Sequence, residues 1–260
     1  MYVKKEGSGP KVYLGIHGWA GNHRTFRRLM PCRPEDAMFY SIDLPGYGAS
    51  PPPAAWTFDA VAQELCDWID GLDSPCLTIV GNCGGALFAL EIAQRRLERV
   101  RRVVLIDPFA YAPWFFRVFT WGAFGKHAYF STFANPIGRW MTNHVLRRKR
   151  SRDTNLTAAF TSVNHSVAHR YICILCGLRN IERFRGLPVP ADIVYGERTF
   201  AAVRRSLPLW KTTLPRAAFH ELTGAGHEPI REATEQLARI VFAPCERVET
   251  ETEDAESAAP

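Results

Sequence analysis

The stretch Ile79-Val80-Gly81-Asn82-Cys83-Gly84-Gly85-Ala86 decides the fold of this 260-residue chain. It follows an apolar run at residues 76–80 that predicts a buried strand, and it leads into a run at residues 86–93 that predicts a helix. Small residues on both sides of Cys83 let the backbone turn sharply and hold the central side chain at strained dihedral angles. The stretch therefore predicts a strand, a tight turn and a helix, with Cys83 presented above the edge of a sheet.

Strands and helices are expected to alternate on both sides of this turn. Further apolar runs predict strands at residues 11–16, 38–42, 103–106 and 189–195, and helices are expected at residues 58–72, 85–96, 200–214 and 228–242. Such alternation is typical of an α/β protein whose mostly parallel, doubly wound sheet is covered by helices on both faces. It is interrupted between residues 109 and 186, so we expect a core of residues 1–108 and 187–245 with an insertion at 109–186.

Three more segments flank the turn in a fixed order. The segment His17-Gly18-Trp19-Ala20-Gly21-Asn22 comes first and Asp43-Leu44-Pro45-Gly46-Tyr47-Gly48-Ala49-Ser50 second, while Gly224-Ala225-Gly226-His227-Glu228-Pro229 lies near the end. With the turn at Cys83 between them, these segments resemble the oxyanion loop, the DLPGxGxS turn, the nucleophile elbow and the catalytic-histidine loop of the α/β-hydrolase superfamily. The resemblance extends from residue 17 to residue 229 and implies the α/β-hydrolase fold. It also implies that the insertion at 109–186 is a mainly helical cap, because it lies where this superfamily inserts one.

The resemblance also implies roles for four residues. Cys83 stands at the position of the nucleophile and His227 at that of the general base, while the backbone N–H groups of Trp19 and Gly84 match the oxyanion donors. A thiol attacks a carbonyl only as thiolate, and its reference pKa of about 8.5 leaves little thiolate at neutral pH. The positive end of the helix that begins near Gly84 and a proton-accepting His227 are the two features that favour ionisation of Cys83.

The third member of the expected triad departs from the family pattern. Its usual carboxylate position, in the turn after the first strand beyond the cap, holds Thr199. Asp107 at the end of the preceding strand occupies an alternative position that some family members use, although an Asp-Pro sequence also caps turns. Glu197, two residues before the usual position, is the alternative acid, and a Cys-His dyad without any acid is the third solution.

The expected cap is unusually aromatic and basic. Residues 111–140 contain eleven aromatic side chains, and residues 109–186 contain twelve Lys and Arg against two Asp and Glu. One interpretation is a small apolar core with a solvated charged face. The other is an apolar acyl-binding tunnel whose basic rim attracts coenzyme A, an acyl carrier protein or an anionic membrane surface. The basic run at residues 147–152 lacks any recognition module, so no nucleic-acid partner is expected.

Other features of the sequence indicate which cofactors and which cellular compartment to expect. His165, His169, Cys173 and Cys176 share one face of an expected helix, but such a helix usually offers only two ligands to one ion, so neither metal nor cofactor is expected. Seven cysteines without framework spacing, no signal-peptide pattern and no long apolar run indicate a cytoplasmic protein. The acidic residues 246–260 are expected to form a disordered tail.

The expected reaction is hydrolysis of an apolar acyl ester or thioester through an acyl-cysteine. The Gly-x-Cys-x-Gly sequence of this elbow resembles that of dienelactone hydrolases, some thioesterase domains and polyhydroxyalkanoate synthases. Amines, thiols and carbanions attack a thioester readily, so an acyltransferase is one alternative. A non-catalytic relative that binds a lipid or a partner protein is the other, and Thr199 in place of the usual acid is the observation that favours it.

Overall fold

A seven-stranded sheet forms the centre of the protein. The computed structural model describes residues 1–149, 154–178 and 181–244. In the order β1-β3-β2-β4-β5-β6-β7, neighbouring strands are parallel except at the edge, where β1 pairs antiparallel with β3. The strands are β1 Val3–Gly7, β2 Lys11–Ile16, β3 Ala37–Ile42, β4 Leu77–Asn82, β5 Val100–Ile106, β6 Ala191–Gly196 and β7 Ala218–Leu222. The predicted α/β fold with a mostly parallel sheet is confirmed.

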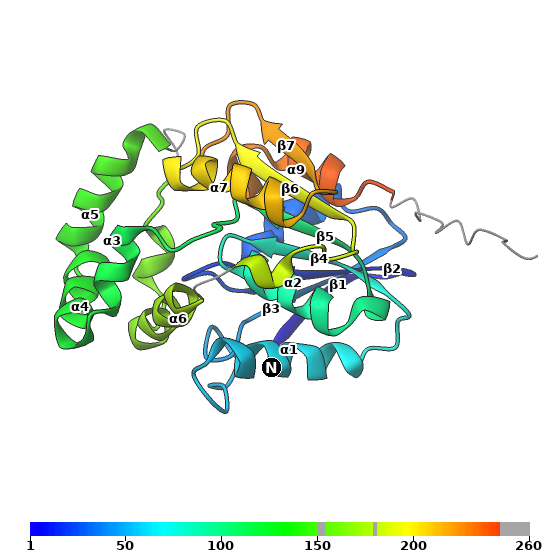
Figure 1. Ribbon diagram of the computed structural model, residues 1–260, viewed down its shortest axis with the longest axis horizontal. Helices are drawn as coiled ribbons and strands as arrows, with labels where there is room; N and C mark the ends of the chain where they lie inside the picture. The colour runs from blue at the N-terminus through cyan, green and yellow to red at the C-terminus, as the bar shows by residue number, and fades with distance from the viewer. Residues whose placement is uncertain (150–153, 179–180, 245–260) are drawn as a thin grey trace, which may run out of the picture.

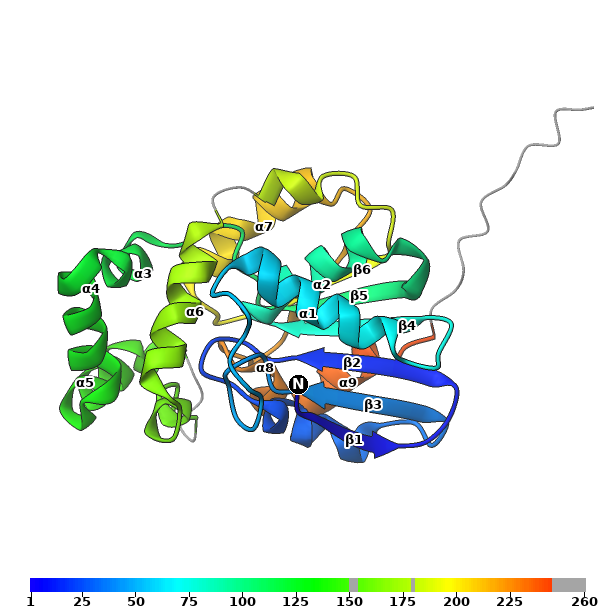
Figure 2. The ribbon, with the colours of Figure 1, turned by 90° about the horizontal axis from the view of Figure 1, so that it is seen from below.

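Helices cover both faces of the sheet (Figures 1 and 2). One face carries α1, Phe58–Asp70, α2, Gly85–Arg95, and α7, Ala201–Thr213, and the other carries the 3-10 helix η1, His23–Cys32, and α9, Thr234–Val241. Phe58 of α1 stacks on Phe88 of α2 with ring centroids 4.6 Å apart. Each face therefore has its own apolar core, as a doubly wound sheet requires.

The helix expected at residues 228–242 is not continuous. It is divided into α8, Pro229–Glu232, and α9, because Ala233 between them has φ −142° and ψ 46°, outside the helical region. The change of direction lets Ile230 of α8 and Leu237 of α9 both be buried in the same apolar cluster. The prediction of one helix was wrong because an apolar period does not reveal a single non-helical residue.

The insert at residues 109–186 is helical in its described part. It contains α3, Trp114–Arg117, α4, Gly122–Tyr129, α5, Pro136–Val145, and α6, His165–Gly177. Both views place α6 next to the core and α3, α4 and α5 beyond it at one end of the molecule (Figures 1 and 2). The acidic segment 246–260 and the end of the basic run 147–152 lie outside the described residues. Within the described ranges, no helix has the length and apolar character needed to span a membrane.

Candidate active site

Cys83 lies at a strained turn between β4 and α2. Its φ is +51°, in the left-handed region that costs a non-glycine residue roughly 1–2 kcal/mol, and its N–H donates to Ile106 O at 2.8 Å. A Cβ on Gly81 would lie 2.6 Å from Ala86 Cα, and one on Gly85 would lie 2.3 Å from Ile16 O. The glycines are therefore required by close backbone approach, and the turn places Cys83 at the N-terminal end of α2.

His227 lies on the loop between β7 and α8, and the structure brings Asp107 to it. Asp107 directly follows β5, has φ +48° and is fully buried. His227 Nδ1 donates to Asp107 Oδ2 at 2.7 Å. The other carboxylate oxygen, Oδ1, accepts the N–H of Gly196 at 3.1 Å. The strained turn after β5 thus points this carboxylate past the end of β6 toward the histidine, which follows β7.

The structure does not bring Glu197, the alternative acid, to His227. Glu197 is exposed at the turn after β6. Its Oε2 accepts the N–H of Gly224 at 2.7 Å, so the carboxylate tethers the loop that carries His227. Of the two carboxylates predicted from the sequence, Asp107 is consequently the one that contacts His227.

Thr199 has a polar role that the sequence did not reveal. It is completely buried, and its Oγ1 donates to Asp107 Oδ2 at 2.5 Å. The same Oγ1 lies 3.5 Å from His227 Nδ1. The signal that could have identified it was the hydroxyl itself, since a threonine at the usual acid position can donate to an acid that has moved to Asp107.

Opposing effects act on the pKa of His227. Burial alone would lower it, but the hydrogen bonds and charges of Asp107 and Cys83 outweigh burial and raise the pKa to about 10. A histidine with a pKa this high carries its proton at neutral pH, and Asp107 holds the outer side of its ring.

The loop after β2 approaches Cys83 from the other side. A Cβ on Gly18 would lie 2.9 Å from Cys83 Cβ, so only glycine fits there. His17 is buried, accepts the N–H of Leu44 through Nε2 at 3.0 Å, and has its pKa lowered to about 4 by burial. Trp19 Nε1 donates to Ala168 O of α6 at 2.7 Å. The loop is thus pinned to the core and to the insert, and Trp19 and Gly84, the predicted oxyanion donors, both line the cavity at Cys83.

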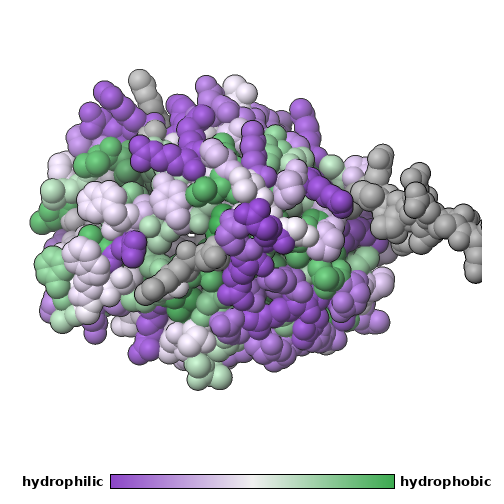
Figure 3. All heavy atoms as spheres, viewed as in Figure 1, coloured by the Kyte–Doolittle hydropathy of each residue, from purple (hydrophilic) through white to green (hydrophobic). Residues whose placement is uncertain are grey.

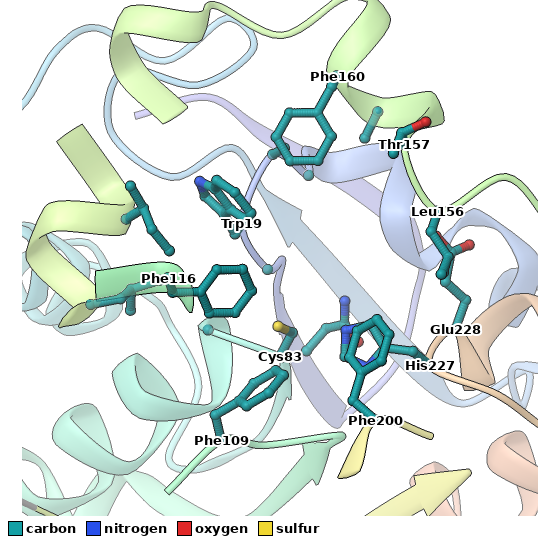
Figure 4. Close-up of a pocket in the computed structure, with 18 of the residues that line it drawn as sticks. Trp19, Cys83, Phe109, Phe116, Leu156, Thr157, Phe160, Phe200, His227 and Glu228 are labelled. Atoms are coloured by element: carbon teal, nitrogen blue, oxygen red, sulfur yellow. The ribbon is translucent and has the colours of Figure 1, made fainter. Parts of the chain in front are cut away.

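A cavity of about 1060 Å³ opens above Cys83, with Trp19 and Phe116 on one side of the cysteine and Phe200 and His227 on the other (Figure 4). Its aromatic lining comprises Trp19, Phe109, Tyr111, Phe115, Phe116, Phe119, Phe133, Phe160 and Phe200. Four exposed arginines lie along its mouth: Arg24, Arg27, Arg28 and Arg231. The cavity therefore combines an aromatic lining with exposed cations on part of its wall.

The four potential metal ligands of α6 do not form a metal site: the two histidines lie next to other polar groups, and the two cysteines are protonated thiols. His165 Nδ1 lies 3.2 Å from Tyr129 OH, and His169 Nε2 donates to Phe119 O at 3.0 Å. Burial raises the pKa of Cys173 and raises that of Cys176 to about 11, so both thiols stay protonated at neutral pH. Across the described residues, no three His, Cys, Asp or Glu side chains are grouped to hold an ion.

Comparison with known proteins gives a family match over most of the chain. The model of the alpha/beta hydrolase family matches residues 14–240. Lipase LipV of Mycobacterium tuberculosis is 35% identical over 109 residues, which are 42% of this chain and 41% of the lipase. A pimeloyl-[acyl-carrier protein] methyl ester esterase of Neisseria meningitidis is 38% identical over 100 residues, 38% of this chain and 30% of the esterase. The chain thus matches well under half the length of these two relatives.

One relative that matches over nearly its whole length and one solved structure extend the comparison. The pimeloyl-[acyl-carrier protein] methyl ester esterase of Chromobacterium violaceum is 26% identical over 263 residues, 96% of this chain and 99% of the relative. The thermophilic esterase of Thermogutta terrifontis superposes with a TM-score of 0.74 at 17% identity, covering 92% of this chain and 90% of the esterase. At that identity the likeness shows the fold alone.

Proposed function

The chain belongs to the alpha/beta hydrolase family, and from this premise we propose that it hydrolyses an apolar acyl ester or thioester through an acyl-cysteine at Cys83. The observation that carries the proposal is the chain of contacts at the floor of the cavity. Cys83 is held at a left-handed turn, a hydrogen bond with Cys83 helps to raise the pKa of His227, and the buried Asp107 accepts from His227 at 2.7 Å. A non-catalytic relative has no need to keep a strained cysteine beside a buried histidine–carboxylate pair.

The first half of the reaction forms the acyl-enzyme. The Cys83 thiolate attacks the carbonyl carbon, and the carbonyl oxygen becomes an anion beside the backbone N–H groups of Trp19 and Gly84, the proposed oxyanion donors. The tetrahedral intermediate collapses by breaking the bond to the alcohol or thiol. His227 gives that leaving group its proton, and Asp107 keeps the imidazole ring oriented through Nδ1.

The second half returns the enzyme to its starting state. His227, now neutral, takes a proton from a water molecule as the water attacks the thioester carbon of acyl-Cys83. The new tetrahedral anion uses the same two N–H donors and collapses to release the carboxylic acid. The departing Cys83 sulfur leaves as thiolate and pairs again with the protonated His227.

The lining of the cavity supports an apolar acyl group on an anionic carrier. Aromatic rings surround the cysteine, whereas Arg24, Arg27 and Arg28 of η1 and Arg231 of α8 lie exposed at the mouth. An acyl chain bound at Cys83 would place the start of its carrier next to these cations, which favours a carrier with phosphates or carboxylates. We therefore propose acyl carrier protein or coenzyme A as the carrier, in line with two relatives named for acyl-carrier-protein esters.

A substrate series with matched variants tests the proposal. Esters of p-nitrophenol with acyl chains of two to twelve carbons are hydrolysed by the wild type, with the highest kcat/KM at medium length, and Cys83→Ala removes this activity. Adding hydroxylamine or ethanolamine distinguishes acyl transfer, since a transferase forms the amide or hydroxamate in preference to the acid. If the Cys83→Ala variant is as active as the wild type, or if neither protein turns over any ester or acyl-coenzyme A, the proposed reaction is wrong.

A further inference from the structure

Helix α5 presents its apolar side to solvent. Ile137, Trp140, Met141 and Val145 recur at helical spacing and are between 56% and 74% exposed. A surface helix of a soluble protein normally buries such a stripe. The stripe of α5 lacks that cover in the described part of the chain, where the helix contains no fully buried residue.

The polar side of α5 faces the protein instead. Arg139 donates through Nη1 to the backbone oxygens of Phe133 and Ala134 at 3.0 and 2.7 Å. Asn143 Oδ1 accepts the N–H of Leu156 at 3.1 Å. These bonds fix the rotation of the helix, so the exposed stripe is a built feature of the fold.

Exposed aromatic residues also occur on α3, on α4 and at Trp121, the N-cap of α4. Trp114, Trp121 and Phe124 are each more than 60% exposed, and Phe115 is also exposed. We name these four residues and the stripe of α5 the aromatic face. Figure 3 shows green and pale spheres over the end of the molecule built by α4 and α5, with hydrophilic side chains between them. Exposed apolar surface of this extent marks an interaction site.

The charge around the aromatic face has one sign. Residues 109–149 include no Asp or Glu. Arg117, Lys126, Arg147 and Arg148 of this segment are exposed. Tryptophan and phenylalanine combined with cations are the composition of helices that lie in the interface of an anionic bilayer.

The aromatic face continues into the cavity above Cys83. Phe115, Met141 and Val145 belong to the face and also line the cavity. The apolar surface of the face is therefore continuous with the wall of the cavity. This continuity connects the surface to the site.

We propose that the aromatic face docks on an anionic phospholipid bilayer, with α3, α4 and α5 lying in the headgroup region and the part of the cavity wall formed by Phe115, Met141 and Val145 facing the lipid. Docking itself is independent of the reaction, whereas the entry of an apolar acyl substrate from the lipid rests on the proposed function. A second copy of the chain is disfavoured as the occupant because two such faces would bring like charges together without any carboxylate of residues 109–149 to offset them.

Vesicle binding tests the proposal directly. The full chain is mixed with vesicles of phosphatidylcholine alone or with 30% phosphatidylglycerol, and the bound fraction is measured by flotation. The anionic vesicles should bind at least tenfold more tightly, and 0.5 M NaCl should weaken that binding by a similar factor. Binding that is absent with both vesicles overturns the proposal.

Matched variants assign the binding to the face. The triple variant Phe124→Ser, Ile137→Ser, Trp140→Ser changes exposed side chains outside the cavity lining and should weaken binding at least a hundredfold. The control is the double variant Leu97→Ser, Leu209→Ser, which changes two exposed leucines outside the face and should bind like the wild type. Cys83→Ala should also bind like the wild type, so failure of docking is distinguishable from failure of the reaction.

Two further outcomes contradict lipid docking and identify the other occupants. A dimer in sedimentation velocity that the triple variant dissociates, with no vesicle binding, assigns the face to a second copy. Binding of acyl carrier protein that the triple variant abolishes, again without vesicle binding, assigns it to a protein partner. Unchanged vesicle binding by a folded triple variant, as judged by circular dichroism and thermal unfolding, also refutes the proposal.

Discussion

Asp107→Asn is the substitution that most sharply tests how His227 is held. Asparagine keeps the shape of the side chain and tolerates the left-handed φ of +48° better than other residues, so the backbone turn after β5 should survive. It removes the negative charge and replaces one oxygen by an NH₂ group. The carboxylate that accepts from His227 Nδ1 at 2.7 Å and from Thr199 Oγ1 at 2.5 Å is thereby lost.

The size of the effect follows from the pKa of His227. Its rise from 6.5 to about 10 means that Asp107 and Cys83 together favour the imidazolium, after burial has opposed them. At 1.36 kcal/mol for each tenfold change in the proton equilibrium, this amounts to roughly 5 kcal/mol. If Asp107 supplies about half, its loss destabilises the imidazolium by about 2–3 kcal/mol and slows acylation by roughly a hundredfold.

The assay is the first turnover of a p-nitrophenyl ester in a stopped-flow instrument, because release of p-nitrophenol reports acylation alone. Glu197→Gln is the matched control: it neutralises the exposed carboxylate beside the His227 loop, which contacts Gly224 N and not the histidine. We expect the acylation rate of this control to stay within a factor of three of the wild type. Thermal unfolding of both variants shows whether either change disturbs the fold.

An orienting role for Asp107 is refuted if folded Asp107→Asn acylates within a factor of two of the wild type. That result would mean that Cys83 and His227 act as a dyad and that the 2.7 Å contact has only a structural role. A loss of roughly a hundredfold in Glu197→Gln with none in Asp107→Asn would instead transfer the acid role to Glu197.

Three other perturbations address the supporting groups. Thr199→Val removes the buried donor to Asp107 and should lower kcat about tenfold at unchanged KM. Thr199→Ser keeps the hydroxyl and should keep most of the activity. Equal losses of kcat in both variants would rule out the hydrogen bond as the cause. The pKa of His227 is raised to about 10, so its contribution to stability is complete below about pH 6.5 and is lost as the pH rises through 10. The free energy of unfolding, measured by urea titration at each pH, should therefore fall over this window in the wild type. It should fall less in His227→Gln. Gly81→Ala should lower the free energy of unfolding by about 2–4 kcal/mol, because its Cβ would lie 2.6 Å from Ala86 Cα. Gly177→Ala should not lower it, because no atom lies within 4 Å of the added Cβ. Similar free energies of unfolding of the two variants in urea would contradict the close approach at Gly81.

The sequence is most informative where close backbone approach limits the residue type. At Gly81 and Gly85 any Cβ would lie less than 3 Å from a neighbouring backbone atom, so the motif around Cys83 predicts a turn that the structure contains. The motif around His227 predicts a histidine near Cys83, and the structure places this side chain in the lining of the same cavity. Such motifs are local, and their geometry needs no knowledge of the rest of the chain.

Features that depend on distant contacts could not be predicted in this way. The contact between Asp107 and His227 joins residues 120 positions apart, and the choice of Asp107 over Glu197 depends on a backbone angle after β5. Strand β7 escaped notice because this edge strand carries His220 and Glu221 in place of an apolar run. The aromatic residues of the insert were interpreted as a core or a tunnel, but an apolar stripe does not reveal that helix α5 turns it outward.

The mass of the enzyme during turnover tests the central claim most directly. The full chain is mixed with an excess of a medium-chain acyl-coenzyme A or p-nitrophenyl ester, quenched in acid within seconds and measured intact, followed by peptide mapping. We expect one added acyl group, located on the peptide that contains Cys83, sensitive to hydroxylamine and absent from Cys83→Ala. An acyl group on another residue, or an ester that is hydrolysed at the wild-type rate by Cys83→Ala, would contradict an acyl-cysteine mechanism.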